Sequence, residues 1–441
     1  MASTWSRTSG SSAETWCSCP DGVHGNDRGT KARRGPARTG RAWLGALLLA
    51  LTALPGTVRA ETTVNPMVVV KTEYDDNIQF TRDNQMDDLV TSLSPSVLLT
   101  HRTERLQSDT SALVRGVKYL EESDLDRVEA LFETDLGYKY TERVSLQGNA
   151  SYRLDSALET ELQETGIVTE QSDRSRLSAG GGITFRLTEL QEVGGSFSLG
   201  RTRYESDRFL DYDTAYLALN WTRTLQNQRD SLVLQPYWSH NSSDVSEVDS
   251  YGLMAGWNRA LTESWTLSLF LGVRRTETEY QGTRPQLVFN PNLPRGGRFV
   301  VDTRTETLEE SDWGAVADAR VRWQGRTWAF GATYDRDLSY TARGETVERD
   351  RLALSVRKRL NPRLSAHGKA WAVLSQYEGI DADEDFYHFN LSPSLSYRLT
   401  EDYLLTAGYS YGYYENRHLE DTGRDRNRVW VSLECSFPNL F

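Results

Sequence analysis

The sequence contains no run of about 18 apolar residues, the length that an α-helix needs to cross a bilayer. Hydrophobic residues occupy only 38% of its 441 positions. The one compact apolar segment, Trp43–Leu54, is too short to serve as a membrane anchor. A bundle of membrane-spanning helices is therefore excluded, although aromatic residues are plentiful for so polar a chain, with 12 Trp and 21 Tyr.

Cysteine and histidine are scarce, with three and six residues respectively. Cys17 and Cys19 lie in the first sixty residues, so Cys435 stands alone in the remainder. This excludes a disulfide framework and a cysteine-based zinc site within one mature chain. The histidines show no ligand spacing, and we predict no metal and no cofactor.

Basic residues are outnumbered, because 50 Lys and Arg face 62 Asp and Glu for a formal net charge of −12. Most charges in the first sixty residues are basic, so the rest of the chain is more acidic still. Nucleic-acid phosphates require a basic surface, and we expect no nucleic-acid partner.

The first sixty residues have the order of a secretory signal peptide. Basic residues precede the apolar segment Trp43–Leu54: Lys31, Arg33, Arg34, Arg38 and Arg41. The segment ends before Pro55, and Val58-Arg59-Ala60 provides a cleavage sequence. We expect residues 1–60 to be a signal peptide cleaved after Ala60, and residues 61–441 to form the mature domain. Twin-arginine export through Arg33 and Arg34 is the alternative, but the flanking pattern for it is missing.

The strongest signal is a two-residue period. Over residues 265–273 the apolar Trp265, Leu267, Leu269, Leu271 and Val273 alternate with Thr266, Ser268, Phe270 and Gly272. Residues 144–153, 214–221 and 389–399 alternate in the same way, with Pro393 predicting a local irregularity. Successive side chains of a strand point to opposite faces. A soluble β-sandwich would also alternate, but its strands are shorter than the roughly ten residues that a tilted membrane strand requires.

Short turns alternate with longer polar stretches along the chain. The predicted turns are Arg102-Thr103, Thr141-Glu142, Thr188-Glu189, Gln226-Asn227, Thr262-Glu263, Gln324-Gly325, Asn361-Pro362 and Thr400-Glu401-Asp402. The longer stretches are 155–175, 205–211, 275–312, 341–350 and 376–385. In outer-membrane barrels short turns face the periplasm and long loops face outward. We therefore predict an all-β fold, a transmembrane antiparallel β-barrel of about 18 strands with both ends in the periplasm.

Strands are expected around residues 70, 95, 115, 134, 149, 181, 198, 218, 235, 254, 269, 318, 331, 354, 369, 392, 408 and 432. Aromatic residues gather near the short turns, as membrane-interface belts do: Tyr138, Tyr140, Trp257, Trp265, Trp323, Trp328, Tyr397 and Tyr403. The simpler alternative is that strands favour aromatic residues in general.

The end of the sequence resembles the signal that the barrel-assembly machinery reads on outer-membrane proteins. Phe441 shares one side of the last expected strand with Leu433 and Phe437, although Asn439 interrupts the pattern. The resemblance implies outer-membrane lipid and that machinery as partners.

The segment Val68–Ile78, with Tyr74-Asp75-Asp76-Asn77-Ile78, is similar to the opening strand of the putative beta-barrel porin type 2 family. The repeated Leu-Thr turn phrase, as in Arg398-Leu399-Thr400-Glu401, also resembles that family. The resemblance implies a barrel in the outer membrane of a Gram-negative bacterium, often associated with exopolysaccharide production and export. A periplasmic polysaccharide export protein would then be a partner.

A barrel of 16–18 strands leaves a water-filled lumen. By the alternation, the residues predicted to line it are Arg153, Arg176, Arg186, Arg274, Asp318, Arg320, Arg322, Lys369, Arg398 and Glu434. They are either a charge- and size-selective lining or ordinary solvated positions. The longest predicted loop, 281–304, either folds inward as a constriction or stands outside the cell.

The acidic run Asp381, Asp383, Glu384 and Asp385 has the oxygen ligands that Ca²⁺ prefers, but a solvated loop is the favoured interpretation. An enzyme is not expected, because no recognisable nucleophile motif accompanies His240, His367 or His388, and no catalytic residue is assigned. The first functional expectation, which rests on the family resemblance, is a channel for export of an extracellular polysaccharide. A general or solute-specific diffusion porin is the alternative, and a non-transporting scaffold or receptor barrel is the third.

Overall fold

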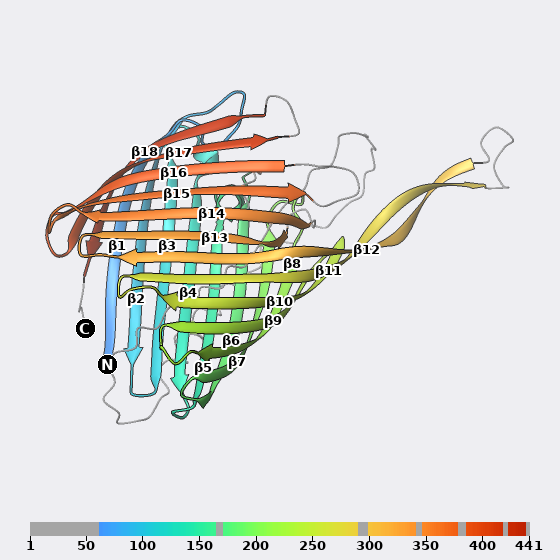
Figure 1. The fold of residues 1–441 in the computed structure, drawn as a ribbon. Helices are drawn as coiled ribbons and strands as arrows, with labels where there is room; N and C mark the ends of the chain where they lie inside the picture. The colour runs from blue at the N-terminus through green and yellow to red at the C-terminus, as the bar shows by residue number, and fades with distance from the viewer. Residues whose placement is uncertain are drawn as a thin grey trace.

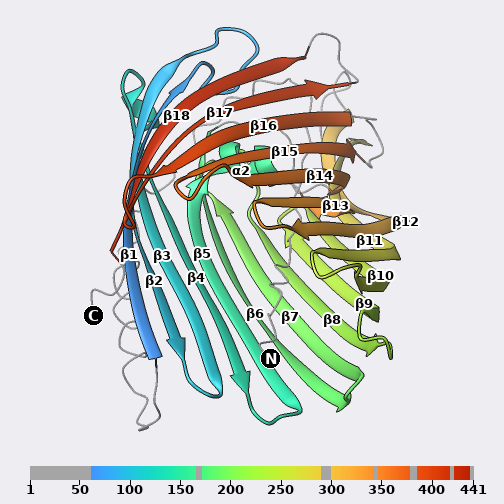
Figure 2. The same cartoon turned by 60° about the vertical axis from the view of Figure 1, so that its left-hand side comes forward.

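The computed structural model describes residues 61–164, 171–289, 299–340, 346–377, 385–417 and 422–437. Within these residues the chain forms one antiparallel sheet of 18 strands. The first strand, β1, pairs with both β2 and β18, so the sheet closes into a barrel (Figures 1 and 2). The predicted fold class is confirmed.

The strands follow one another around the barrel in chain order. The first nine are β1 (Glu61–Asp75), β2 (Asp88–Arg102), β3 (Leu106–Tyr119), β4 (Arg127–Lys139), β5 (Val144–Ser156), β6 (Asp173–Thr188), β7 (Gln191–Tyr204), β8 (Tyr212–Thr224) and β9 (Asp230–Ser243). The other nine are β10 (Ser246–Ala260), β11 (Trp265–Phe289), β12 (Phe299–Gln324), β13 (Trp328–Tyr340), β14 (Thr346–Arg359), β15 (Leu364–Tyr377), β16 (Asp385–Arg398), β17 (Tyr403–Asn416) and β18 (Arg424–Ser436). Every expected strand position falls inside a different one of these strands. Two helices interrupt the pattern, η1 (Ser123–Leu125) and α2 (Ala157–Glu164).

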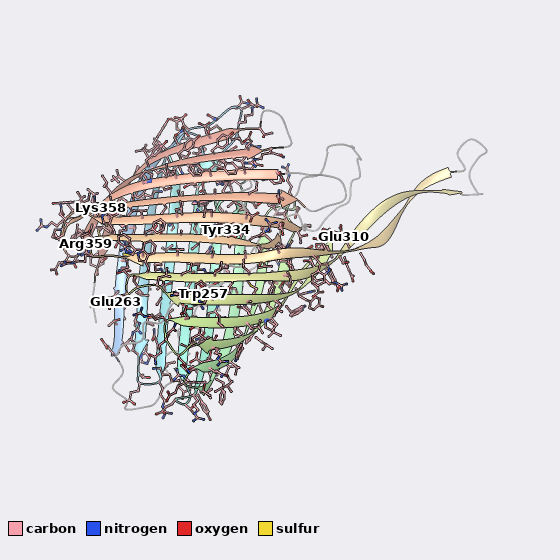
Figure 3. The ribbon with its side chains drawn as sticks, in the orientation of Figure 1. Trp257, Glu263, Glu310, Tyr334, Lys358 and Arg359 are labelled. Carbon is pink, nitrogen blue, oxygen red and sulfur yellow. The ribbon has the colours of Figure 1, made fainter. Side chains whose placement is uncertain are left out.

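The eight short turns lie at one end of the barrel, which we call the turn end, and the opposite end is the loop end. Figure 3 places Glu263, Lys358 and Arg359 at the turn end and Glu310 at the loop end. All eight turns occur where they are predicted. At four turns a threonine hydroxyl accepts a backbone N–H three residues on: Thr103, Thr141, Thr262 and Thr400. At two more turns the side-chain oxygen of Asn227 or Asn361 does the same. The Leu-Thr phrase is thus a hydroxyl-stabilised turn between two strands.

The apolar residues of the alternation lie on the outer face of the barrel. Leu219, Leu271 and Val431 are among the most exposed large apolar side chains. In water such a surface would be unfavourable, but a lipid-facing surface requires it. Among the described residues, no helix is both long and apolar enough to span a membrane.

Proline interrupts the hydrogen-bonded ladder without shifting its register. Between β16 and β17 the pairing stops after Leu391 and resumes at Ser394, on either side of Pro393. Proline has no backbone N–H and removes one rung of the ladder. The irregularity predicted at Pro393 is therefore confirmed.

The prediction of a long loop over residues 275–312 is wrong. Strands β11 and β12 continue through this region and pair as far as Phe289 with Phe299. The resulting hairpin projects past the loop end of the barrel (Figure 1). Residues 290–298 lie outside the described part. The backbone from 281 to 289 and from 299 to 304 stands outside the barrel rather than folding into it.

Candidate functional site

A single helix, α2, lies inside the barrel at the loop end (Figure 2). It belongs to the stretch 155–175, which the sequence indicates only as a polar loop. Its sequence, ALETELQE, is rich in residues with high helix propensity. Leu158 and Leu162 are one turn apart and both buried, while Glu159, Glu161 and Glu164 give the helix three acidic residues and no basic one. This helix organises the candidate site.

An apolar cluster anchors α2. Leu158 and Leu162 belong to the same buried cluster as four aromatic residues from distant parts of the chain: Phe80, Phe209, Phe386 and Tyr414. Phe80 and Phe209 come from loop-end connections, whereas Phe386 and Tyr414 come from β16 and β17. Burial of each leucine contributes on the order of 2 kcal/mol. The anchor therefore draws α2 toward the β16–β18 wall.

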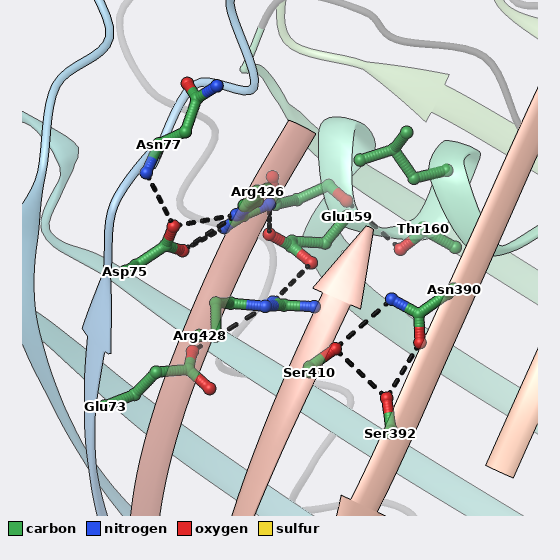
Figure 4. Close-up of polar contacts among 12 residues, drawn as sticks. Glu73, Asp75, Asn77, Glu159, Thr160, Asn390, Ser392, Ser410, Arg426 and Arg428 are labelled. Carbon is green, nitrogen blue, oxygen red and sulfur yellow. Dashed lines mark hydrogen bonds and ion pairs between the residues drawn. The ribbon is translucent and has the colours of Figure 1, made fainter. Parts of the chain in front are cut away.

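Ion pairs fix the N-terminal half of α2 to β18. The carboxylate of Glu159 lies 2.7 Å from Nη1 of Arg426 and 3.3 Å from Nη1 of Arg428 (Figure 4). Burial alone would raise the pKa of Glu159, but the charges of the two arginines outweigh it and hold the pKa well below its usual range. Glu159 is therefore ionised at every physiological pH.

The C-terminal end of α2 contacts two other parts of the wall. The carboxylate of Glu164 lies 3.4 Å from Arg174 and 3.6 Å from Arg176, both on β6. Its backbone oxygen accepts a hydrogen bond of 2.9 Å from Arg349 of β14. Arg349 also binds Asp335 of β13 at 2.5 Å. Burial opposes ionisation of Glu164 too, but the neighbouring arginines lower its pKa.

Contacts from β6, β14 and β18 thus hold α2 across the interior. The helix narrows the bore at this level because its backbone and side chains occupy space that a simple barrel of this size leaves open.

The segment that resembles the porin family closes the barrel next to α2. Both carboxylate oxygens of Asp75 lie 2.9 Å from Nε of Arg426, across the β1–β18 seam. Asp76 accepts hydrogen bonds from the backbone and side-chain amides of Asn427. Asn77 donates to the backbone oxygen of Asp425 at 3.0 Å. The Asp-Asp-Asn motif therefore joins the first strand to the last and orients Arg426 toward Glu159.

Phe80 has a strained backbone that brings its ring into the site. Its φ is 51°, in the left-handed region that bulky residues rarely adopt. Asn77 holds this turn, because its side-chain oxygen accepts the amide of Thr81 at 2.9 Å and its backbone oxygen accepts the amide of Phe80 at 3.0 Å. Such strain costs on the order of 1–3 kcal/mol and persists only where the surrounding contacts impose it.

The structure brings two of the ten residues predicted to line the lumen together at α2, and buries a third elsewhere in an ion pair. Arg153 and Arg176 face Glu164 of α2, and Arg274 is buried with Asp337 3.2 Å away. Arg186 forms an exposed pair with Glu192, and Arg320 pairs with Asp318 on its own strand. The other four, Arg322, Lys369, Arg398 and Glu434, have no ion pair among the described residues. Their lining role remains a prediction.

Several residues that matter most at the site were not predicted: Asp75, Glu159, Arg349, Arg426 and Arg428. One signal was available, because Arg424, Arg426 and Arg428 occupy alternate positions in an acidic chain. Such spacing places three guanidinium groups on one face of β18. No comparable signal marks Glu159.

Other predictions fall partly outside the described residues. The signal peptide, residues 1–60, lies there, as do Phe441 and the acidic residues Asp381, Asp383 and Glu384. Leu433 lies on β18, and Phe437 follows it with its amide bonded to the backbone oxygen of Pro66. In the described part of the chain, no group of three or more His, Cys, Asp or Glu side chains is placed to hold a metal ion.

Residues 61–233 match the family model described as Putative beta-barrel porin 2, which confirms the resemblance predicted from the opening strand. The closed barrel and this match over residues 61–233 define an outer-membrane β-barrel. Its location is the outer membrane of a Gram-negative bacterium.

Solved structures of similar fold share little sequence with this chain. OccK2 (OpdF) of Pseudomonas aeruginosa is 10% identical, with a TM-score of 0.45 over 86% of this chain and 98% of that one. A BenF-like porin from Pseudomonas fluorescens Pf-5 is 9% identical, with a TM-score of 0.43 over 87% of this chain and 100% of that one. The ferric-catecholate import receptor Fiu of E. coli K12 is 8% identical, with a TM-score of 0.45 over 86% of this chain and 82% of that one. No curated protein matches the chain.

Proposed function

We propose that this barrel is a passive diffusion channel for small polar solutes, with α2 as its constriction. The observation that carries the proposal is the attachment of α2 to three separate parts of the inner wall. Glu159 pairs with β18, whereas Glu164 contacts β6 and β14. A helix fixed at both ends sets an upper limit on solute size.

The chemistry of the interior supports the same function. The wall around α2 carries guanidinium and carboxylate groups paired with each other, together with serine and asparagine side chains. A polar lining allows hydrated solutes to pass without losing all their hydrogen bonds. A solute moving down its concentration gradient requires no energy-coupling partner.

Export of a polysaccharide rests on the family resemblance alone. A polymer in transit would have to displace α2 and break its ion pairs, whereas a small solute would pass beside it. Export therefore stays a prediction.

Planar-bilayer recording of the purified mature chain tests the proposal. We expect open, ohmic conductance without any partner protein. The double variant Glu159→Gln/Glu164→Gln should conduct more, because amides lose the charge attraction that holds α2 to the wall. It should also shift the reversal potential toward anions, because the facing arginines lose their counter-charges.

Glu263→Gln is the matched control, since Glu263 is exposed in a short turn far from α2. It removes one carboxylate and should leave conductance and selectivity unchanged. A silent channel, together with loss of surface polysaccharide on gene deletion, would refute passive diffusion and favour export.

A further inference from the structure

A cavity of about 200 Å³ lies between α2 and the inner wall of β15–β18. Residues on its two sides include Phe80, Leu162, Gln163, Trp371, His388 and Asn390. The volume equals that of about seven water molecules at ~30 Å³ each. It has room for one six-membered ring with its substituents.

A buried histidine without a second partner faces this cavity. His388 is only 3% exposed, and its Nδ1 lies 3.0 Å from the backbone oxygen of Leu162. A carbonyl oxygen only accepts, so Nδ1 carries the hydrogen and the neutral ring leaves Nε2 as an acceptor. Nε2 has no hydrogen-bond partner among the described residues. A Cβ atom added at Gly412 would lie 3.7 Å from it, so the absence of a side chain there leaves the cavity open.

Donors and acceptors alternate along the adjoining wall. Asn390 donates to Ser410 at 3.2 Å and accepts from Ser392 at 2.8 Å (Figure 4). Arg428 uses Nη1 for Glu159, and its other N–H groups have no partner in the described part of the chain. A ligand that fits this wall must both donate and accept, as hydroxyl groups do.

Three apolar side chains also line the cavity: Phe80, Leu162 and Trp371. Trp371 pairs with Asn390 across β15 and β16, and its ring packs edge-on to His388 at 4.5 Å. A pyranose ring presents both kinds of surface, because its C–H groups form an apolar face and its hydroxyl groups radiate from the rim. Pockets that combine aromatic side chains with a few placed polar groups are the usual form of small-molecule sites.

The local charge disfavours an anionic ligand. The two guanidinium groups at the cavity, Arg426 and Arg428, already face three carboxylates: Asp75, Glu159 and Glu73. Arg351 lies with its guanidinium 5.9 Å from the centre of the Trp371 ring and does not line the cavity. An added carboxylate would meet an excess of negative charge.

We propose that this cavity is a binding subsite for one neutral monosaccharide ring, beside the path through the constriction. The subsite rests on the proposed diffusion function, since it names a solute class for that path. Nε2 of His388 accepts from one hydroxyl group, Arg428 donates to another, and Trp371 packs against the C–H face.

Channel recording with D-glucose, D-glucuronate and glycerol as probes tests the subsite on the purified mature barrel. We expect D-glucose to reduce the current in a saturable manner. D-glucuronate should bind at least about tenfold more weakly, and glycerol, which has no ring, should give no saturable block. Trp371→Leu should raise the Kd for glucose about tenfold, because it removes the aromatic surface.

Glycine substitutions provide a matched series. Gly412→Ala adds a Cβ at ordinary contact distance and should keep glucose binding within about twofold, whereas Gly412→Leu fills the cavity and should raise the Kd at least about tenfold. Gly368→Leu adds the same side chain to β15 where nothing lies within 4 Å, and should not change glucose binding.

The possible outcomes distinguish failure of the proposed subsite from failure of the proposed diffusion channel. Conductance that glucose does not change would overturn the subsite and leave the channel in place. If the channel is silent, titration calorimetry in detergent measures glucose binding without conduction. Binding that Gly412→Leu abolishes would then support the subsite alone, and absence of binding would overturn it. Tighter binding of glucuronate than of glucose would overturn the neutral ligand class.

Discussion

Asp75 is a single residue on which the stability of the barrel seam should depend. It pairs with Arg426 across the β1–β18 seam, and both side chains are buried. Removing one partner of a buried pair typically costs about 3–5 kcal/mol, and Arg426 keeps Glu159 as a second partner. We expect Asp75→Asn to lower the free energy of unfolding by about 3 kcal/mol, at the lower end of that range.

Guanidinium unfolding in lipid vesicles, followed by tryptophan fluorescence, measures this change. Glu263→Gln should stay within about 0.5 kcal/mol of the original protein, since the residue is exposed. An unfolding midpoint for Asp75→Asn equal to that of the original protein would show that the seam does not depend on this pair.

The pH dependence of the constriction follows from Glu159. Its pKa is lowered below the ordinary value of 4.5 because the charges of Arg426 and Arg428 outweigh the effect of burial. A carboxyl group with a lowered pKa contributes its full stabilisation above the ordinary value and loses it as the pH falls through the lowered one. Conductance should therefore be constant from pH 8 to pH 5, and should rise only in more acidic solution. A transition centred near pH 6 would assign the titration to another group.

At the scale of elements, the strands were predictable and the helix was not. A strand can be recognised from a short piece of sequence. The alternation of apolar and polar residues along Trp265–Val273 depends only on neighbouring residues and on the lipid outside the barrel. The position of α2 depends on residues far along the chain, since Glu164 and Arg349 are separated by 185 positions and Glu159 and Arg428 by 269. A polar loop with acidic residues looks the same whether it faces solvent or enters the lumen.

The region of the β11–β12 hairpin was wrongly predicted as a loop, because the local sequence there does not show the pairing of the two strands. The region was predicted as a loop from its length and polarity, and it contains Pro285, Pro291 and Pro294, each of which lacks the N–H for a ladder hydrogen bond. In the structure Pro285 is paired with Thr303 in a two-stranded extension beyond the barrel. A strand with a free side tolerates proline when the missing N–H would point away from its only partner.

The apolar anchor of α2 gives a prediction at the element scale. Leu158→Ala with Leu162→Ala removes both leucines from the cluster around Phe80, and each such truncation costs about 2–5 kcal/mol. The loss should be local, because the barrel strands keep their ladders. We expect hydrogen exchange to accelerate in α2 while it stays unchanged in β16–β18.

Leu217→Ala is the control for this experiment, since Leu217 is exposed on the outer face of β8. It should leave exchange in α2 unaffected. Equal protection of α2 in the double variant and the original protein would mean that ion pairs alone hold the helix.

At the scale of the whole molecule, the prediction concerns the orientation of the barrel in the outer membrane, that is, which end faces the periplasm. Strand β1 begins and β18 ends at the turn end, and short turns in outer-membrane barrels face the periplasm. The hairpin of β11 and β12 should then project from the cell surface.

An epitope inserted between Phe289 and Phe299 should bind antibody on intact cells. The same epitope between Thr262 and Glu263 should bind only after the outer membrane is permeabilised, and each tagged protein should still fractionate with the outer membrane. Antibody access to the Thr262 tag on intact cells, with the Phe289 tag hidden, would invert the barrel and place α2 and its cavity on the periplasmic side.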